Sequence, residues 1–267
     1  MTPQETRDAA RTALACLDLT SLNDTDTASD IVALCQRAVG TTLPDRGPVA
    51  AASPDRGPVA AVCVWPRRAA LARRLLPPHI AVAAVANFPD GSADLQRAVR
   101  DTVRIVAAGA QEVDVVFPYR DFAAAPALLS AVRRACPGLR LKVILETGEL
   151  QDAALISRAS RIAVDAGADF LKTSTGKTPR SATPEAAVQM LQAIAQDSGA
   201  SGRVGFKPSG GIRTVADAAL YMGLTAQHLG AEAVNPARFR IGASSLLDDI
   251  ESVLAGAANR PASSSGY

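Results

Sequence analysis

The feature that most constrains this chain is a series of short, almost continuously apolar runs separated by longer segments. A strand that is covered on both faces of a parallel sheet is apolar along its whole length, whereas a half-exposed strand alternates. The pattern therefore predicts a parallel sheet that is covered by helices. The six clearest runs are residues 60–64, 80–86, 113–117, 141–145, 170–173 and 204–207.

The segments between these runs have helical periodicity, with Leu95, Val99 and Val103 on one face of a predicted helix. Two further strands, near residues 15–19 and 238–242, bring the count to eight strand–helix units. Eight units in 267 residues favour a single-domain α/β fold, a (β/α)8 TIM barrel over residues 1–257. An open doubly wound sheet is the alternative, but it usually carries a glycine-rich first turn, and the turn after Leu19 is Thr-Ser-Leu-Asn.

Two segments fall outside this pattern. The octapeptide PDRGPVAA occurs at residues 44–51 and again at 54–61. Because surface loops tolerate insertions at little cost, we interpret residues 44–61 as a duplicated loop without chemistry. Residues 258–267 are small and polar, which predicts a flexible C-terminal tail.

Composition excludes several classes of function. The 28 basic and 26 acidic residues nearly cancel and the basic residues do not cluster, so no nucleic-acid partner is expected. The four cysteines form no C-x-x-C pair, and neither a disulfide framework, a metal site nor a cofactor is predicted. The longest apolar run, residues 80–86, is far shorter than the roughly 18 residues of a membrane span. No secretion signal is recognisable at the N-terminus, so a cytoplasmic location is expected.

Charged residues inside apolar strands carry the chemical information, because burying a charge without a purpose is costly. They are Asp114, Lys142, Lys172 and Lys207, and Glu146 shares a strand face with Lys142. If that face points inward, two lysines and two carboxylates would meet Lys172 inside the barrel. Satisfied interior ion pairs are the alternative interpretation.

Three lysines on successive strands favour covalent catalysis by an amine. A nucleophilic lysine must be neutral, and the reference pKa of about 10.4 leaves little free amine near neutral pH. A second lysine nearby disfavours the charged form of the first. Lys172 and Lys207 form such a pair on adjacent predicted strands, and either could be the nucleophile.

Three loops of small residues follow neighbouring strands near the end of the chain. The loops after the last two strands of this barrel commonly bind phosphate, and small residues let backbone N–H groups approach the anion. We therefore expect a phosphate site formed by Thr175-Gly176-Lys177, Ser209-Gly210-Gly211 and Gly242-Ala243-Ser244-Ser245.

Along nearly its whole length the sequence resembles the deoxyribose-phosphate aldolase family. The resemblance is carried by several long motifs in the expected order, which are LDLTSLNDTDT (17–27), VCVWPR (62–67), NFPDG (87–91), EVDVVFPYR (112–120), LKVILETGEL (141–150), GADFLKTSTGK (167–177), GFKPSGGIRT (205–214) and IGASSLL (241–247). Departures from the family pattern at Asp90, Ser209 and Ile241 remove no catalytic group.

The resemblance implies reversible cleavage of 2-deoxy-D-ribose 5-phosphate to acetaldehyde and D-glyceraldehyde 3-phosphate. It implies that Lys172 forms the Schiff base, that Lys207 favours its neutral form, that Asp114 relays protons through water, and that Tyr267 is a proton shuttle. It also implies a homodimer that needs no cofactor. The implied substrate-binding residues are Asp18, Thr20, Cys63, Lys142, Thr175, Gly176, Lys177, Gly210, Gly211, Gly242, Ser244 and Ser245.

Two alternatives remain open at this point. One is another Schiff-base sugar-phosphate aldolase or a transaldolase-type barrel, which would use a donor of three or more carbons. The other is a non-catalytic barrel that binds a sugar phosphate without turnover.

Overall fold

The structure is a computed structural model that describes residues 1–40 and 56–256. The first copy of the PDRGPVAA repeat and the tail with Tyr267 lie outside the described residues, as do the first two residues of the second copy.

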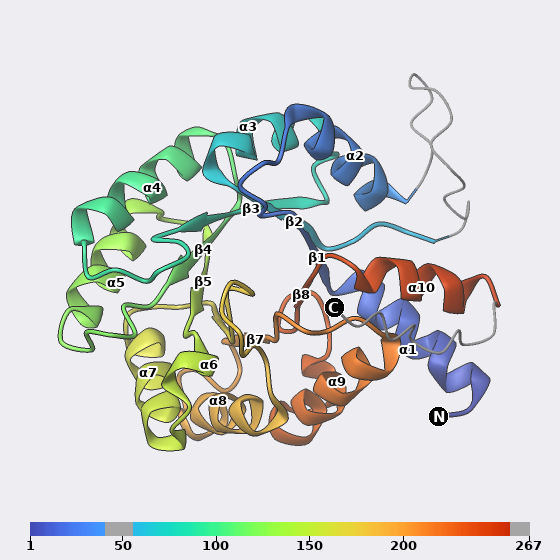
Figure 1. The fold of residues 1–267 in the computed structure, drawn as a ribbon. Coiled ribbons are helices and arrows are strands. Elements are labelled where there is room, and N and C mark those ends of the chain that lie inside the picture. Colours follow the sequence, from blue (N-terminus) through green and yellow to red (C-terminus); the bar gives the residue numbers. More distant parts are fainter. Residues whose placement is uncertain (41–55, 257–267) are drawn as a thin grey trace.

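Eight parallel strands form the predicted barrel, and Figure 1 shows them as a central ring. Hydrogen-bonded neighbours follow the order β7-β6-β5-β4-β3-β2-β1-β8. Between β7 and β8 the ring is joined by two isolated bridges, Phe206 to Phe239 and Ser209 to Gly242. The strands are β1 (Leu17–Thr20), β2 (Ala61–Val64), β3 (Ala81–Ala86), β4 (Glu112–Val116), β5 (Arg140–Ile144), β6 (Phe170–Lys172), β7 (Gly205–Lys207) and β8 (Ile241–Ala243).

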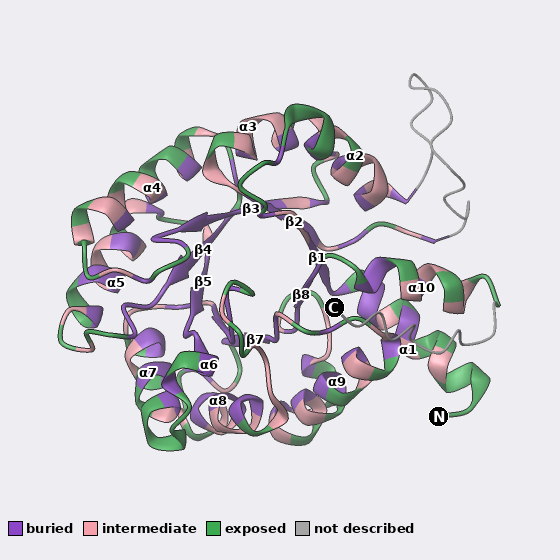
Figure 2. Ribbon diagram, viewed as in Figure 1, coloured by how far each residue is buried: buried purple, intermediate pink, exposed green. Residues whose placement is uncertain are grey.

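Helices surround the ring, and buried residues alternate with exposed ones along them (Figure 2). Helix α1 packs against α9 and α10. The strands are buried on both sides, which explains their continuous apolar sequence. The helices are α1 (Pro3–Ala15), α2 (Ala28–Val39), α3 (Pro66–Leu75), α4 (Leu95–Ala107), α5 (Ala125–Ala135), α6 (Thr147–Leu150), α7 (Ala153–Asp165), α8 (Pro184–Gln196), α9 (Val215–Leu229) and α10 (Leu246–Leu254), with a short 3-10 helix at Ala231–Ala233.

The fold-class prediction is confirmed, and the strand boundaries differ by a few residues. The first strand begins at Leu17 rather than near residue 15, because α1 occupies residues 3–15. That helix has a capping box between Thr2 and Glu5 and a proline at its first position, which are both readable in the sequence.

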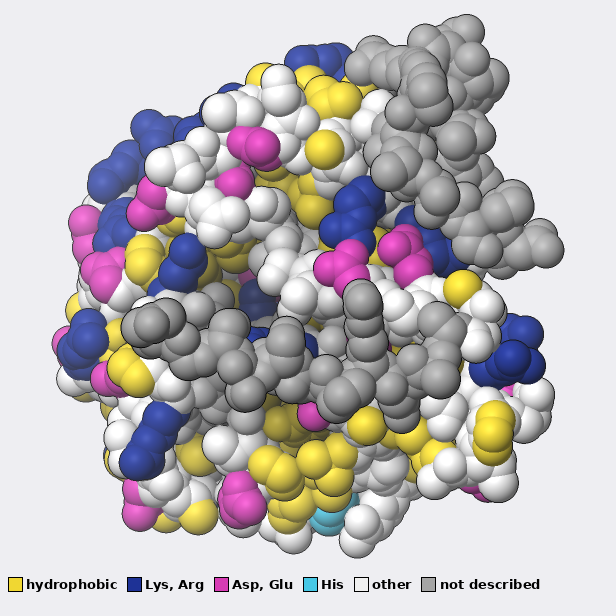
Figure 3. Space-filling view, turned by 45° about the vertical axis from the view of Figure 1, so that its right-hand side comes forward, with side chains coloured by type: hydrophobic (Ala, Val, Ile, Leu, Met, Phe, Trp, Pro, Cys, Tyr) yellow, Lys and Arg dark blue, Asp and Glu magenta, His cyan; other side chains and the backbone are white. Residues whose placement is uncertain are grey.

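The surface fits the balanced composition. On the face drawn in Figure 3, Lys and Arg side chains are interspersed with Asp and Glu side chains along the helices. Within residues 1–40 and 56–256, no helix combines the length and the apolar character that a membrane span requires.

Strand register places the charged residues of neighbouring strands side by side. Asp114 of β4 pairs with Lys142 of β5, and Lys172 of β6 pairs with Lys207 of β7. Ile144, two residues beyond Lys142 and hence on the same face, pairs with Lys172. The three lysines therefore project from one face of the sheet, which is the inside of the barrel.

Candidate active site

Seven charged side chains form one connected network inside the barrel, which we call the barrel ion cluster. None of the seven side chains is more than 4% exposed. They come from five strands and from the residue before β8. The members are Asp18, Glu112, Asp114, Lys142, Lys172, Lys207 and Arg240.

Asp114 is the centre of this cluster and contacts all three lysines. Its Oδ1 accepts from Lys142 Nζ at 2.7 Å, and its Oδ2 accepts from Lys172 Nζ at 3.0 Å and from Lys207 Nζ at 2.8 Å. Lys142, Lys207 and Lys172 outweigh the cost of burial and hold the pKa of Asp114 well below its usual range. Asp114 is therefore ionised, and it fixes the positions of three amino groups.

The three lysines differ in their number of carboxylate partners. Lys142 pairs with Asp18 at 3.3 Å, Glu112 at 2.5 Å and Asp114 at 2.7 Å. Lys207 pairs with Asp18 at 2.5 Å and with Asp114 at 2.8 Å. Asp114 and Asp18 raise the pKa of both lysines against the effect of burial, so both are charged.

Lys172 has one carboxylate partner, Asp114, and is the only one of the three lysines that reaches the cleft above the cluster. Its side chain is 3% exposed, whereas those of Lys142 and Lys207 are fully buried. A reactant in the cleft would therefore meet the amino group of Lys172 first.

The cleft has a volume of about 620 Å³ and lies at the C-terminal ends of the strands, where barrel active sites form. Twelve of the residues predicted from the sequence line it, and five more residues complete the lining. The predicted residues are Thr20, Lys172, Thr175, Gly176, Lys177, Ser209, Gly210, Gly211, Gly242, Ala243, Ser244 and Ser245; the others are Ser21, Leu22, Asn23, Ile212 and Arg213.

Five predicted residues do not line the cleft and lie buried beneath it. Four of them, Asp18, Asp114, Lys142 and Lys207, belong to the barrel ion cluster. The fifth, Cys63, lies with its Sγ 3.9 Å from Asp114 Oδ2, and burial together with Asp114 raises the pKa of its thiol. The position of Tyr267 falls outside the described residues.

Two glycines in the cleft have no room for a side chain. Gly210 has φ +83°, and an added Cβ would overlap the side chain of Ser181. At Gly242 an added Cβ would lie 2.8 Å from Ser209 Cβ and 3.1 Å from Lys207 Cε. Strand β8 therefore packs directly on the side chain of a cluster lysine.

Glu146 is buried and lies close enough to Lys172 for that lysine to lower the pKa of its carboxyl, although no ion pair joins the two described side chains. Glu146 has φ 56°, which turns the chain out of strand geometry just after β5. Its carboxylate instead accepts from the backbone N–H of Thr175 and from the hydroxyls of Thr175 and Thr178. Glu146 thus holds the loop that follows Lys172.

Sequence reasoning missed Glu112 and Arg240, which complete the cluster. Arg240 donates to Asp18 at 2.6 Å and to Glu112 at 2.9 Å, and Glu112 also pairs with Lys142. The signal for Glu112 was present, since it lies two residues before Asp114 in an apolar strand and so shares its face.

No group of three or more His, Cys, Asp and Glu side chains in residues 1–40 and 56–256 is placed to hold a metal ion.

A parallel (β/α)8 barrel with a lysine at the floor of a glycine-lined cleft is the arrangement expected of a lysine-dependent aldolase. Comparison with known proteins agrees. A family model described as DeoC/LacD family aldolase matches residues 12–252. The chain therefore belongs to the DeoC/LacD aldolase family, and the resemblance predicted from its motifs is confirmed.

Individual relatives extend the match to the whole chain. A protein of Agrobacterium fabrum named deoxyribose-phosphate aldolase is 46% identical over 276 residues, covering 99% of this chain and 98% of that protein. A crystal structure described as a putative deoxyribose-phosphate aldolase from Toxoplasma gondii has TM-score 0.81 at 24% identity, covering 96% of this chain and 97% of that one. Another, from Coccidioides immitis, has TM-score 0.72 at 29% identity, covering 90% of this chain and 85% of that one.

Proposed function

We propose that this aldolase cleaves 2-deoxy-D-ribose 5-phosphate reversibly to acetaldehyde and D-glyceraldehyde 3-phosphate through a Schiff base on Lys172. The observation that carries the proposal is the position of Lys172, whose amino group lies between the ion cluster and the open cleft. Full-length similarity to a protein named deoxyribose-phosphate aldolase supports the choice of substrate.

The first step joins Lys172 to the aldehyde carbon of the open-chain sugar. The neutral amine adds to C1, and loss of water gives an iminium ion. Asp114, held ionised 3.0 Å from Lys172 Nζ, stabilises the positive charge that develops on that nitrogen. The fixed charges of Lys142 and Lys207 keep Asp114 in place during this change.

The second step breaks the C2–C3 bond of the sugar. A base removes the proton of the C3 hydroxyl, D-glyceraldehyde 3-phosphate leaves, and the electron pair of the broken bond forms an enamine on Lys172. A water molecule near Asp114 carries protons to and from the reacting atoms. Protonation of the enamine at C2 and hydrolysis then release acetaldehyde and regenerate the free amine.

The loops around the cleft bind the phosphate of the substrate. Lys177 is exposed at the rim and supplies a positive charge, and Ser244 and Ser245 precede the N-terminus of α10, where the helix dipole favours an anion. Anchoring the phosphate at a fixed distance from Lys172 aligns the reacting carbon, which is how proximity contributes to the rate.

Borohydride trapping with acetaldehyde tests the proposal. Peptide mass mapping is expected to find the reduced adduct on Lys172 in the wild-type protein and in Lys177→Met, and to find none in Lys172→Arg. A wild-type protein that forms no adduct at this position would contradict the proposal. An adduct formed only with a longer donor such as dihydroxyacetone would instead indicate a transaldolase-type reaction.

Chelation tests the predicted independence of metal. Cleavage of 2-deoxy-D-ribose 5-phosphate is expected to proceed equally with and without EDTA. The homodimer and the cytoplasmic location stay predictions, and size-exclusion chromatography with light scattering measures the first.

A further inference from the structure

A separate cavity opens between helices α3 and α4, which are neighbours in the ring of helices (Figure 1). It has a volume of about 540 Å³, within the range of roughly 300–1,000 Å³ that is common for small-molecule sites. Trp65, which follows β2, and Phe88, which lies just after β3, are part of its lining. None of the described residues lines both this cavity and the cleft, so it is a distinct place on the molecule. We call it the α3–α4 pocket.

Two aromatic rings belong to the lining of the α3–α4 pocket. The rings of Trp65 and Phe88 meet edge to face, with their centroids 5.3 Å apart and an interplanar angle of 85°. The Nε1–H of Trp65 donates to the backbone oxygen of Asn23 at 3.1 Å, so the polar atom of this side chain already has a partner. The two side chains therefore offer the pocket an aromatic surface, which favours a ligand that carries a flat ring.

Three arginines give the same pocket a cationic side, and they are Arg67, Arg97 and Arg104. Arg97 is already paired, since its Nη1 lies 2.8 Å from Asp90 Oδ1. Arg104 lies seven residues further along α4 and therefore on the same face of the helix. Arg104 is exposed, and its guanidinium forms no ion pair with the residues that the structure describes. An incoming anion can therefore bind Arg104 without displacing a carboxylate.

The remaining charged groups of the lining do not cancel this positive charge. Arg67 donates from Nη2 to the backbone oxygen of Asp24 at 3.0 Å, and within the described part of the chain it too forms no ion pair. Asp101 is the only carboxylate among the described lining residues, and its Oδ2 accepts from the backbone N–H of Asn87 at 3.1 Å. Arg67 and Arg104 thus outnumber the one lining carboxylate, and the pocket favours an anion.

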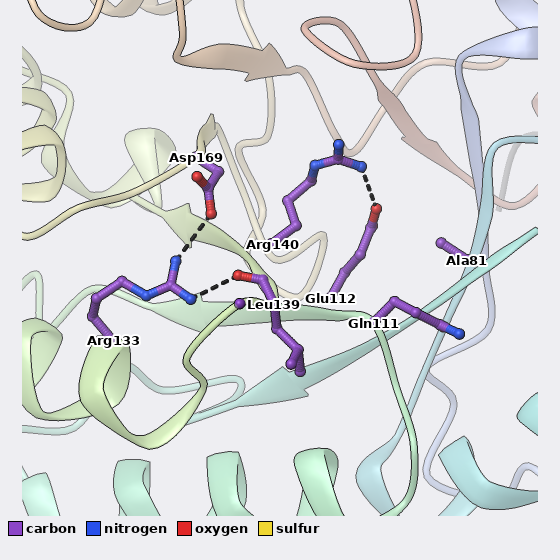
Figure 4. A pocket seen from close by; sticks show the side chains of 8 residues that line it. Ala81, Gln111, Glu112, Arg133, Leu139, Arg140 and Asp169 are labelled. Atoms are coloured by element: carbon purple, nitrogen blue, oxygen red, sulfur yellow. Dashed lines mark hydrogen bonds and ion pairs between the residues drawn. The ribbon is translucent and has the colours of Figure 1, made fainter.

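The pocket at the N-terminal ends of the strands lacks this surplus of positive charge. Figure 4 shows its two ion pairs, which join Arg133 to Asp169 at 3.0 Å and Arg140 to Glu112 at 2.8 Å. Both arginines that line it are paired with a carboxylate, so an anion there has to compete with an internal ion pair. The α3–α4 pocket is therefore the better anion site of the two.

We propose that the α3–α4 pocket is a second ligand site, which binds a small molecule with a planar aromatic ring and a phosphate or other acidic group. The ring lies against Trp65 and Phe88, and the acidic group lies on Arg104. A guanidinium can form two parallel hydrogen bonds to a phosphate, and a ring that packs on an aromatic side chain gains from burial and from stacking. The proposal uses no residue of the cleft and is independent of the reaction at Lys172.

The sequence supplies a reporter for this site, because Trp65 is the only tryptophan of the chain. The probe is adenosine 5′-monophosphate (AMP), and it is expected to quench the emission of Trp65 in a saturable way, because a purine that stacks on an indole quenches its fluorescence. Adenosine lacks the anion and is expected to bind at least about tenfold more weakly. Inorganic phosphate lacks the ring, so it is expected to displace AMP only at concentrations at least about tenfold higher.

Three variants locate the bound nucleotide. Arg104→Met is expected to weaken AMP binding roughly tenfold or more, because it removes a charged donor. Arg100→Met is the matched control: it removes the same charge from the same helix, but Arg100 lies 3.9 Å from Asp94 and does not line the pocket. Its dissociation constant for AMP is expected to change by less than about twofold, since exposed charges are screened. Lys177→Met removes the cation at the rim of the cleft and is expected to leave AMP binding unchanged.

Several results would overturn the proposal. Trp65 emission that does not respond to AMP, or equal dissociation constants in the wild-type protein and Arg104→Met, would show that the pocket binds no aromatic anion. Equal binding of adenosine and AMP would show that the site does not recognise the acidic group. A loss of binding in Lys177→Met without one in Arg104→Met would place the nucleotide in the cleft. Urea unfolding checks that Arg104→Met is folded under assay conditions, and Arg104→Gln takes its place if it is not.

Discussion

Glu146 offers the sharpest test of how the proposed phosphate-binding loop after β6 is held. Its carboxylate accepts from Thr175 N at 3.3 Å, from Thr178 Oγ1 at 3.2 Å and from Thr175 Oγ1. The Thr175 hydroxyl in turn accepts from the backbone N–H of Lys177 at 3.0 Å. Glu146 therefore orders a loop of which Thr175, Gly176 and Lys177 line the cleft, without lining it itself.

The magnitude follows from the donors that lose their partner. Glu146→Ala leaves the N–H and the hydroxyl of buried Thr175 without an acceptor, and each such group costs about 1–3 kcal/mol. The loop can recover part of this cost by moving into the cleft, where water or the substrate satisfies the donors. If about 1.4–2.7 kcal/mol appears as weaker phosphate binding, the KM for 2-deoxy-D-ribose 5-phosphate rises about 10- to 100-fold. Glu146→Gln, which keeps one carbonyl acceptor, is expected to show a smaller rise.

The assay compares kcat/KM for the phosphorylated sugar with that for 2-deoxy-D-ribose. The ratio of the two is expected to fall in Glu146→Ala, because the unphosphorylated sugar does not use the loop. Glu149→Gln, which changes an exposed carboxylate on the same short helix α6, is the matched control with an unchanged ratio. Equal losses for both substrates would refute the reasoning, since they would place Glu146 in the lysine chemistry instead.

The pH dependence of stability gives a second measurement on the same residue. Burial raises the pKa of Glu146, so its ionised form is disfavoured in the folded state. Its contribution to the free energy of unfolding is therefore largest below the unfolded pKa of about 4.3 and declines as pH rises through the higher folded value. Urea unfolding of Glu146→Gln is expected to lack this decline.

Three further predictions concern other parts of the molecule. Gly242→Ala forces a Cβ to within 3.1 Å of Lys207 Cε, so kcat is expected to fall at least several-fold while the sugar phosphate still binds. An unchanged kcat would show that β8 shifts freely at this position. The neighbouring cations lower the pKa values of the three cluster carboxylates, so these groups stabilise the folded state above about pH 4 and lose that effect as pH falls toward the folded pKa values. Urea unfolding between about pH 3 and 7 measures the loss, and a free energy of unfolding that does not change with pH would contradict it. Deletion of Tyr267 is expected to slow proton exchange of the enamine while leaving Schiff-base formation intact; equal exchange rates by NMR would refute a shuttle role.

The barrel and its lysines could be predicted because burial makes their sequence signals strong. Eight continuously apolar runs required a covered parallel sheet, and lysines inside such runs required a purpose. Glu112 and Arg240 were harder to predict because they lie at the N-terminal ends of strands, where a charge commonly marks the approach to solvent. Their enclosure depends on the register of β4 with β5 and of β1 with β8, and register is a property of the folded barrel.

Backbone conformation explains why Glu146 contacts the loop after β6. The prediction from sequence assumed that side chains alternate between the two faces of β5 as far as Glu146, which would put Glu146 on the same face as Lys142. The positive φ at Glu146 ends that alternation, and such a conformation in a residue other than glycine has no dependable sequence signal. The same turn places the Glu146 carboxylate where it accepts hydrogen bonds from Thr175 and Thr178 in the loop after β6. The residue that departs from strand geometry therefore also supports the cleft.

The thin junction between β7 and β8 has a consequence for ligand binding. Seven of the eight neighbouring strand pairs share a regular ladder, while this one has two isolated bridges. The lining of the cleft includes the loop after β7, Ser209 to Arg213, and the end of β8 with the loop that follows it, Gly242 to Ser245. A bound phosphate that accepts hydrogen bonds from both segments would add a link between β7 and β8, the strand pair with the fewest hydrogen bonds in the barrel. Hydrogen exchange of the amides along β7 and β8 is therefore expected to slow on saturation with substrate more than exchange along β3 and β4.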